Sequence, residues 1–134
     1  MTPKFRAWFD GHMYEVAKLD FWGDPNQASC DLAGPDGYGE LAELFDIYLG
    51  EVELMQSTGL LDKNGKEIFE GDVVENTTQR VYLGHRFEVS WNDGYACFQL
   101  LSGGKSSNVP LIQDFMSYEV IGNIYENPLA KEST

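Results

Sequence analysis

Residues 58–74, TGLLDKNGKEIFEGDVV, decide the fold because two tight turns separate short strands within them. The Asn64-Gly65 pair tolerates positive φ, so the chain reverses there and returns as Glu67-Ile68-Phe69. Gly71 reverses it again into Val73-Val74, a β-branched pair that suits a buried strand. This stretch therefore predicts closely spaced antiparallel strands.

Strand-like segments continue on both sides of this stretch. Residues 4–22 are typical of a β-hairpin, residues 28–32 of a short strand, and residues 52–57 of a strand leading into the opening segment. Residues 87–91, in which Phe87, Val89 and Trp91 alternate with polar residues, are followed by an Asn92-Asp93-Gly94 turn and a strand at residues 95–101. Residues 118–125 form the last strand, in which Gly122 indicates a bulge or a close backbone approach. We expect a mainly β protein with an α+β elaboration, in which a small antiparallel SH3-like barrel over about residues 60–125 packs with the N-terminal β-hairpin and a short helix.

The short helix is predicted from Glu40 onward. Leu41, Leu44, Phe45 and Tyr48 stand at i, i+3, i+4 and i+7, the spacing of one apolar helix face. Residues 45–49 fit an extended strand equally well. One or two further helical turns are predicted at residues 111–116, and an edge strand at residues 81–83.

The chain of 134 residues fits one domain, and its 18 aromatic residues and 14 glycines are typical of a β-rich globular protein. We predict a single domain over residues 1–128, with an N-terminal α+β part (1–57) and a β-barrel part (58–128). Residues 129–134 are predicted to form a flexible tail.

A formal charge of −13 is the strongest compositional bias. Such a polyanion repels nucleic acid backbones and anionic lipid, so we expect neither direct nucleic acid binding nor membrane binding. No basic residue stands between Lys18 and Lys63, and this interval holds ten acidic residues. Three readings remain open for it: a solubilising surface, a docking face for a basic partner, and a surface that imitates DNA phosphates.

The two cysteines, Cys30 and Cys97, lie far apart in the chain. No apolar h-region follows Met1, and no apolar run approaches the length needed to cross a bilayer. We therefore expect a soluble cytoplasmic protein with free thiols.

No residue pattern indicates catalysis, a metal or a cofactor. The acids of residues 62–72 lack the spacing of a calcium loop, and lysines stand among them. The two histidines, His12 and His85, are too isolated for a zinc site. Cys97 lies in the middle of a predicted strand, where a buried inert thiol is usual. Residues 102–106 lack the spacing of a phosphate-binding loop. We predict a non-enzymatic protein with no catalytic, cofactor-binding or metal-binding residues.

The aromatic residues include one pair that flanks a turn. Trp91 and Tyr95 stand on either side of the Asn92-Asp93-Gly94 turn, where exposed aromatics on a small barrel can form a groove for extended or proline-rich peptides. Packing in the core is the alternative. Exposure of Trp91 favours the groove, and its burial excludes it.

Four segments of the chain resemble the YopX family. They are KFRAW (4–8), MYEV (13–16), ELMQSTGL with DKNGKEIFEGD (53–60 and 62–72), and YEVIGNIYENP (118–128). The resemblance implies a small phage- or prophage-borne protein of the bacterial cytoplasm, and the family supplies no catalytic or binding residues. Residues 23–50 and 75–110 depart from the family pattern.

Three functions remain as hypotheses. The first is a phage accessory module that binds an unidentified host or phage protein, and the second is an acidic, DNA-mimicking inhibitor of a host nucleic-acid-binding protein. The third is an enzyme of unrecognised type, which would need a concave pocket with converging carboxylates of perturbed pKa. Strand edges and apolar content are also compatible with a homo-oligomer. The candidate partner surface consists of Asp36, Glu40, Glu43, Asp46, Trp91 and Tyr95.

Overall fold

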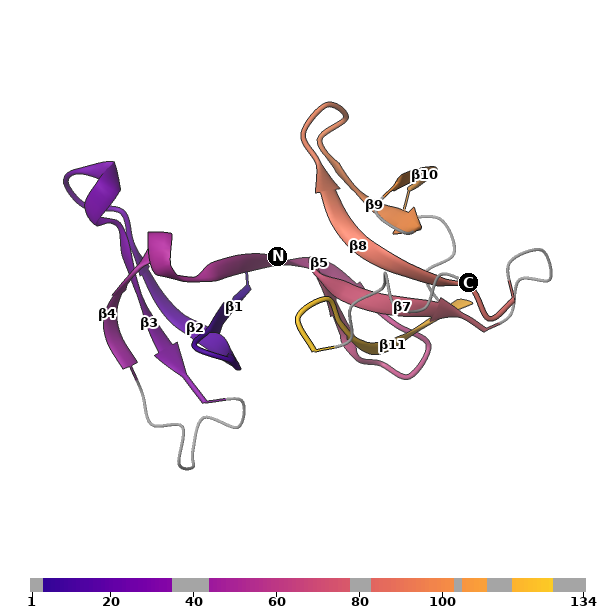
Figure 1. Ribbon diagram of the computed structural model, residues 1–134, viewed down its shortest axis with the longest axis horizontal. Coiled ribbons are helices and arrows are strands. Elements are labelled where there is room, and N and C mark those ends of the chain that lie inside the picture. The colour runs from indigo at the N-terminus through magenta and orange to yellow at the C-terminus, as the bar shows by residue number, and fades with distance from the viewer. Residues whose placement is uncertain (1–3, 35–43, 78–82, 103–104, 111–116, 127–134) are drawn as a thin grey trace. The chain divides into compact units, whose positions relative to one another are not determined.

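The computed structural model describes residues 4–34, 44–77, 83–102, 105–110 and 117–126. The chain divides between Gln56 and Ser57 into an N-terminal and a C-terminal compact unit. Strand β5 (Glu53–Leu61) passes from the first unit into the second (Figure 1). The expected mainly β fold is confirmed, because antiparallel strands make up nearly all of the regular structure in the described residues.

The N-terminal unit is an antiparallel sheet in the order β4-β3-β2-β1-β5. Its β1–β2 hairpin confirms the hairpin predicted for residues 4–22, and its turn uses left-handed Asp10 and Gly11, at φ 50° and 81°. Such a turn matches the twist of the two strands. The other elements are β1 (Phe5–Phe9), β2 (His12–Asp20), β3 (Ser29–Ala33), β4 (Leu44–Tyr48) and the 3-10 turns η1 (Pro25–Gln27) and η2 (Leu49–Glu51).

The predicted short helix is wrong over residues 44–48. Leu44–Tyr48 is strand β4, paired antiparallel with β3, and residues 40–43 lie outside the described part. A bulge explains the helix-like spacing: the register shifts between Cys30 and Leu32, and Asp46 takes a φ of 55°. Leu44 and Ile47 therefore both reach the core although three positions separate them.

The C-terminal unit contains a five-stranded antiparallel sheet in the order β10-β9-β8-β7-β11, and β5 pairs with β6. Gly71 at φ 88° makes the predicted β6–β7 turn, and the register shift between Val120 and Gly122 confirms the predicted bulge. The strands are β6 (Glu67–Phe69), β7 (Asp72–Asn76), β8 (Arg86–Asn92), β9 (Cys97–Ser102), β10 (Lys105–Pro110) and β11 (Tyr118–Asn123).

The core of each unit follows from strand alternation. In the C-terminal unit, Phe87 and Val89 of β8 face inward two residues apart and pack with Ile68, Val74 and Leu100. The N-terminal core is built from Ala7, Tyr14, Cys30, Leu32 and Val52.

A closed SH3-like barrel is not found in the described residues. The pairing of the five-stranded sheet ends at β10 on one side and at β11 on the other. The helical turns predicted at residues 111–116 lie outside the described part, as do residues 81 and 82 of the predicted edge strand, while Leu83 lies in a turn.

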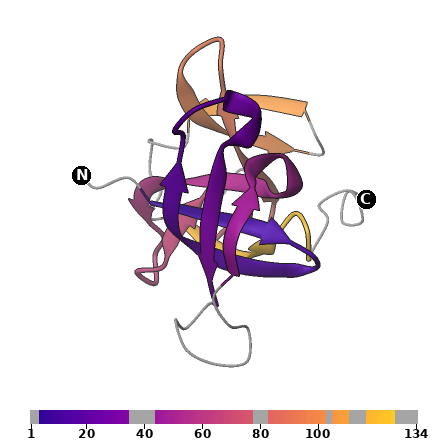
Figure 2. The same ribbon diagram turned by 90° about the vertical axis from the view of Figure 1, so that its left-hand side faces the viewer.

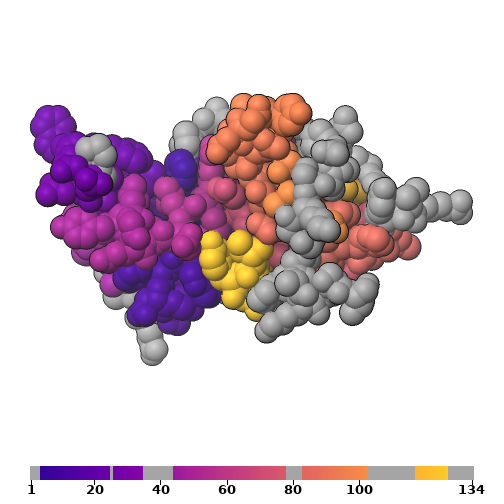
Figure 3. Space-filling model, turned by 45° about the horizontal axis from the view of Figure 1, so that its top comes forward, coloured from indigo at the N-terminus to yellow at the C-terminus, as the bar shows by residue number. Residues whose placement is uncertain are grey.

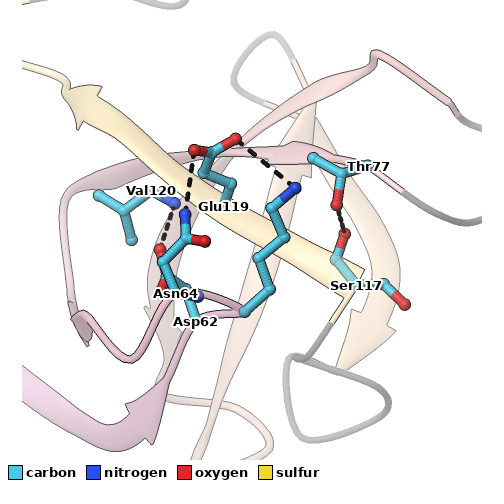
Figure 4. A network of polar contacts seen from close by, with 7 residues as sticks. Asp62, Asn64, Thr77, Ser117, Glu119 and Val120 are labelled. Carbon is cyan, nitrogen blue, oxygen red and sulfur yellow. Dashed lines mark hydrogen bonds and ion pairs between the residues drawn. The ribbon is translucent and has the colours of Figure 1, made fainter.

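One buried carboxylate fastens the turn of the opening segment to β11. Asp62 Oδ1 accepts the N–H groups of Asn64 and Lys66 at 2.8 and 2.9 Å, and its Oδ2 accepts the N–H of Val120 at 2.9 Å (Figure 4). The Asn64 side chain also donates from Nδ2 to Glu119 Oε1 at 3.1 Å. Burial by itself raises the pKa of Asp62, but the three N–H donors outweigh it and hold the pKa below its usual value. Asp62 is therefore a structural anion.

Candidate interaction surfaces

The predicted partner surface is divided between the two units. Asp46 belongs to the N-terminal unit, whereas Trp91 and Tyr95 belong to the C-terminal unit. Asp36, Glu40 and Glu43 lie outside the described residues.

The β8–β9 hairpin, which projects from its sheet in Figure 1, carries Trp91 and Tyr95. Asn92 shapes its turn: Oδ1 accepts the N–H of Gly94 at 2.8 Å and that of Tyr95 at 3.2 Å, and Nδ2 donates to Gln99 Oε1 at 3.0 Å. The strand predicted to start at Tyr95 starts instead at Cys97, because the turn extends to Ala96, at φ 52°. The hairpin is thus held by its own polar contacts.

The apolar face of this hairpin continues beyond the core. Trp91 pairs with Phe98 across the strands, and their rings meet edge to face with centroids 5.0 Å apart. Phe98 packs against the core cluster, while Trp91 is 38% exposed and Tyr95 is 82% exposed. Two large aromatics are therefore presented to solvent on an ordered support, as a peptide-binding groove requires.

Asp46 is exposed on β4, and its backbone is fixed. Its N–H donates to Asp31 Oδ1 at 3.0 Å, so the backbone donor at the bulge has a hydrogen-bond partner. Asp46 adopts a left-handed conformation there, at φ 55°. Its carboxylate therefore projects from a defined position on the strand.

A second group of exposed aromatics lies outside the predicted partner surface. Trp22 follows β2, and Phe45 and Tyr48 lie on β4; they are 89%, 62% and 52% exposed, and Phe21 is exposed as well. The helical spacing placed Phe45 and Tyr48 on a buried face. The signal that could have found them is the extended alternative for residues 45–49, which puts neighbouring side chains on opposite faces.

The acids of the opening segment are engaged in the fold. Asp72 Oδ2 accepts the Phe69 N–H at 2.8 Å, and Glu67 accepts a hydrogen bond from the Ser57 hydroxyl. No group of three or more metal-type side chains comes together within the described residues. Asp62, Glu67 and Asp72 thus stabilise turns and strand pairs.

The surroundings of Glu88 disfavour its ionised form. Partial burial, and then the nearby charge of Glu70, raise the pKa of Glu88. The two acids lie in the C-terminal unit, where Glu88 pairs with Val73 and Leu101. Their repulsion lowers stability when both are ionised.

The two histidines contact aromatic rings, and the two cysteines are wholly or partly buried. His12 meets the Tyr14 ring edge on, and His85 lies against Phe87. Cys30 is a buried free thiol whose pKa is raised by burial and by the charge of Asp31, while Cys97 is a half-buried free thiol in β9. A raised thiol pKa disfavours the nucleophilic thiolate.

Fold and surfaces together define a class: an antiparallel β protein of two compact units that displays aromatic side chains at strand ends and turns. The family model for the YopX protein matches residues 4–130. The chain belongs to the YopX family.

One solved structure is similar to this chain over nearly its whole length. The crystal structure of protein EF1440 from Enterococcus faecalis is similar to this chain at a TM-score of 0.52 and 26% sequence identity, over 96% of both chains. The comparison with curated proteins gives no match. Within the part that the structure describes, every helix is too short or too polar to span a bilayer.

Proposed function

We propose that this chain is a non-enzymatic protein-binding module, carried by a phage or prophage and acting in the host cytoplasm. The observation that supports it best is the β8–β9 hairpin, where Trp91 and Tyr95 are exposed although their support is ordered. Tryptophan and tyrosine contribute disproportionately to protein interfaces because they bury a large area for little lost conformational freedom. The resemblance to the YopX family supports the phage origin.

The test is affinity capture from a bacterial host lysate with the tagged chain and with the double variant Trp91→Ser/Tyr95→Ser. We expect proteins that the wild type retains and the variant loses. Asp93→Ala is the matched control, because Asp93 is exposed in the same turn and carries no aromatic ring. Capture at background level by the wild type, or equal capture by the double variant, refutes the proposal.

The second candidate is an acidic decoy that occupies the nucleic-acid-binding groove of a host protein. The net charge of −13 and the interval without basic residues between Lys18 and Lys63 favour it. It predicts that joint neutralisation of Asp36, Glu40, Glu43 and Asp46 to Asn or Gln abolishes capture and that binding weakens steeply with salt. The hairpin variant then binds normally, which separates the two functions.

A further inference from the structure

Strand β4 forms one end of the N-terminal sheet among the described strands, since it pairs with β3 alone. Leu49 N–H donates to Ala28 O at 2.9 Å, and the register continues through Ser29 opposite Tyr48. Antiparallel pairs alternate, so the N–H and C=O of Tyr48 point away from β3. An added extended chain could pair with these groups.

The side chain of Tyr48 lies on the sheet face opposite the core. Its neighbours Cys30 and Ile47 are directly paired and belong to the core cluster, so the next pair, Ser29 and Tyr48, faces the other way. Asp20 pairs with Ser29 on the adjoining strand. Asp20, Ser29 and Tyr48 thus form a row across three strands, spanning about 10 Å at the usual strand spacing.

Exposed aromatics stand close to this row in the chain. Phe21 and Trp22 follow Asp20 directly, and Phe45 precedes Tyr48 by three residues, about 10 Å along the strand. Figures 1 and 2 show η1 and η2, which begin just beyond these residues, at the same end of the N-terminal sheet. The β2–β3 turn, in purple, stands out from its unit in the space-filling view (Figure 3). We name Phe21, Trp22, Phe45 and Tyr48 the aromatic edge.

The charge around the aromatic edge is negative. Asp24, Asp46 and Glu51 are exposed beside it, and Asp20 is half-buried in the row. Lys18 is the nearest basic residue in the chain, and it stands opposite Asp31 in the β2–β3 pairing. Aromatic faces among uncompensated carboxylates attract cations, since the ring quadrupole and the carboxylates favour positive charge together.

We propose that the aromatic edge docks an extended, arginine-rich segment of a partner protein. Arginine fits better than lysine because its planar guanidinium stacks on aromatic rings while its N–H groups bind carboxylates. A second copy of this chain is a poor occupant, since it would bring the same acids against Asp20 and Asp46 and each copy carries −13. The extended shape follows from the outward backbone groups of Tyr48.

This inference rests on the proposed protein-binding role but uses neither Trp91 nor Tyr95. The two surfaces belong to different units and are removed by different substitutions. Lysate capture that depends on the hairpin would leave the proposed function standing even if the aromatic edge binds nothing.

The test is fluorescence anisotropy of the full chain with fluorescein-labelled peptides of about 12 residues that alternate arginine and valine, long enough to exceed the row and β4. We expect measurable binding in about 150 mM NaCl, clearly weaker binding of the lysine–valine peptide, and none of the glutamate–valine peptide. The triple variant Trp22→Ser/Phe45→Ser/Tyr48→Ser should weaken binding about tenfold or more. Amide shifts on adding peptide should fall on residues 20–22 and 45–48.

Tyr95→Ser is the matched control, because it removes an exposed aromatic from the other unit without changing charge. It should bind the peptide like the wild type, and all variants should keep the wild-type melting temperature. Equal binding by the triple variant, equal affinity for lysine and arginine peptides, or shifts confined to other residues overturns the inference. So does a dimer in sedimentation that the triple variant dissociates, since the occupant is then a second copy.

Discussion

Asp62→Ala removes the acceptor of three backbone N–H groups in the C-terminal unit. A hydrogen bond to a charged group contributes about 1.5–3 kcal/mol, and a buried donor that loses its partner costs a similar amount. Val120 is half-buried, so its N–H should account for about 2–3 kcal/mol. Asn64 and Lys66 are exposed, and water compensates most of their loss, leaving about 0.5 kcal/mol each. The variant should therefore lower the free energy of unfolding by about 3–4 kcal/mol.

Urea unfolding followed through the amide signals of β7 and β11 measures this loss, and hydrogen exchange of the Val120 amide locates it. The pKa of Asp62 is lower in the folded than in the unfolded chain, so its stabilising effect is present above the unfolded pKa and disappears as the pH falls through the folded pKa. The difference between wild type and variant should hence be largest near neutral pH and shrink in acid.

Lys63→Ala is the control for Asp62→Ala. Lys63 lies in the same turn, and its half-exposed ion pair with Glu119 spans 4.0 Å, so its removal should change stability by less than about 1 kcal/mol. A loss below about 1 kcal/mol for Asp62→Ala, or a loss that stays constant from neutral pH to pH 3, would refute the structural role of the carboxylate.

Glu88→Gln should raise the urea midpoint at pH 7, because the raised pKa of Glu88 means that its ionised form opposes folding. The gain in stability should vanish below the unfolded pKa of about 4.3. A lower midpoint for the variant at pH 7 would contradict this. Gly71→Ala should cost about 1–3 kcal/mol in the same assay, since Gly71 has a φ of 88° and its N–H and C=O bond Val89 and Ile124; an unchanged midpoint would show that the turn relaxes. Asn92→Ala should speed hydrogen exchange at the Gly94 and Tyr95 amides while the β7 amides exchange as before, and a global increase would mean that Asn92 supports more than its hairpin.

The sequence predicted turns and the buried faces of strands where these depend only on neighbouring residues. Asn64-Gly65 and Gly71 mark turns because glycine alone adopts positive φ without strain. The bulge at Gly122 was predicted because a glycine inside a strand often marks a bulge. Phe87 and Val89 identified the buried face of β8 by their spacing. Family membership likewise followed from short local matches at both ends and in the middle of the chain.

The tertiary structure decided what depends on contacts between distant residues. Leu44–Tyr48 has a helical spacing, yet pairing with β3 and the bulge at Asp46 make it a strand, because the backbone groups of β3 supply hydrogen bonds that local propensity does not anticipate. The sequence did not predict the structural role of Asp62 either, because its third hydrogen-bond donor, the Val120 N–H, lies 58 residues away in the chain. Sequence determined where the chain turns and which residues are apolar; only pairing between strands determined which of those apolar side chains, Phe45 and Tyr48 among them, remain in water.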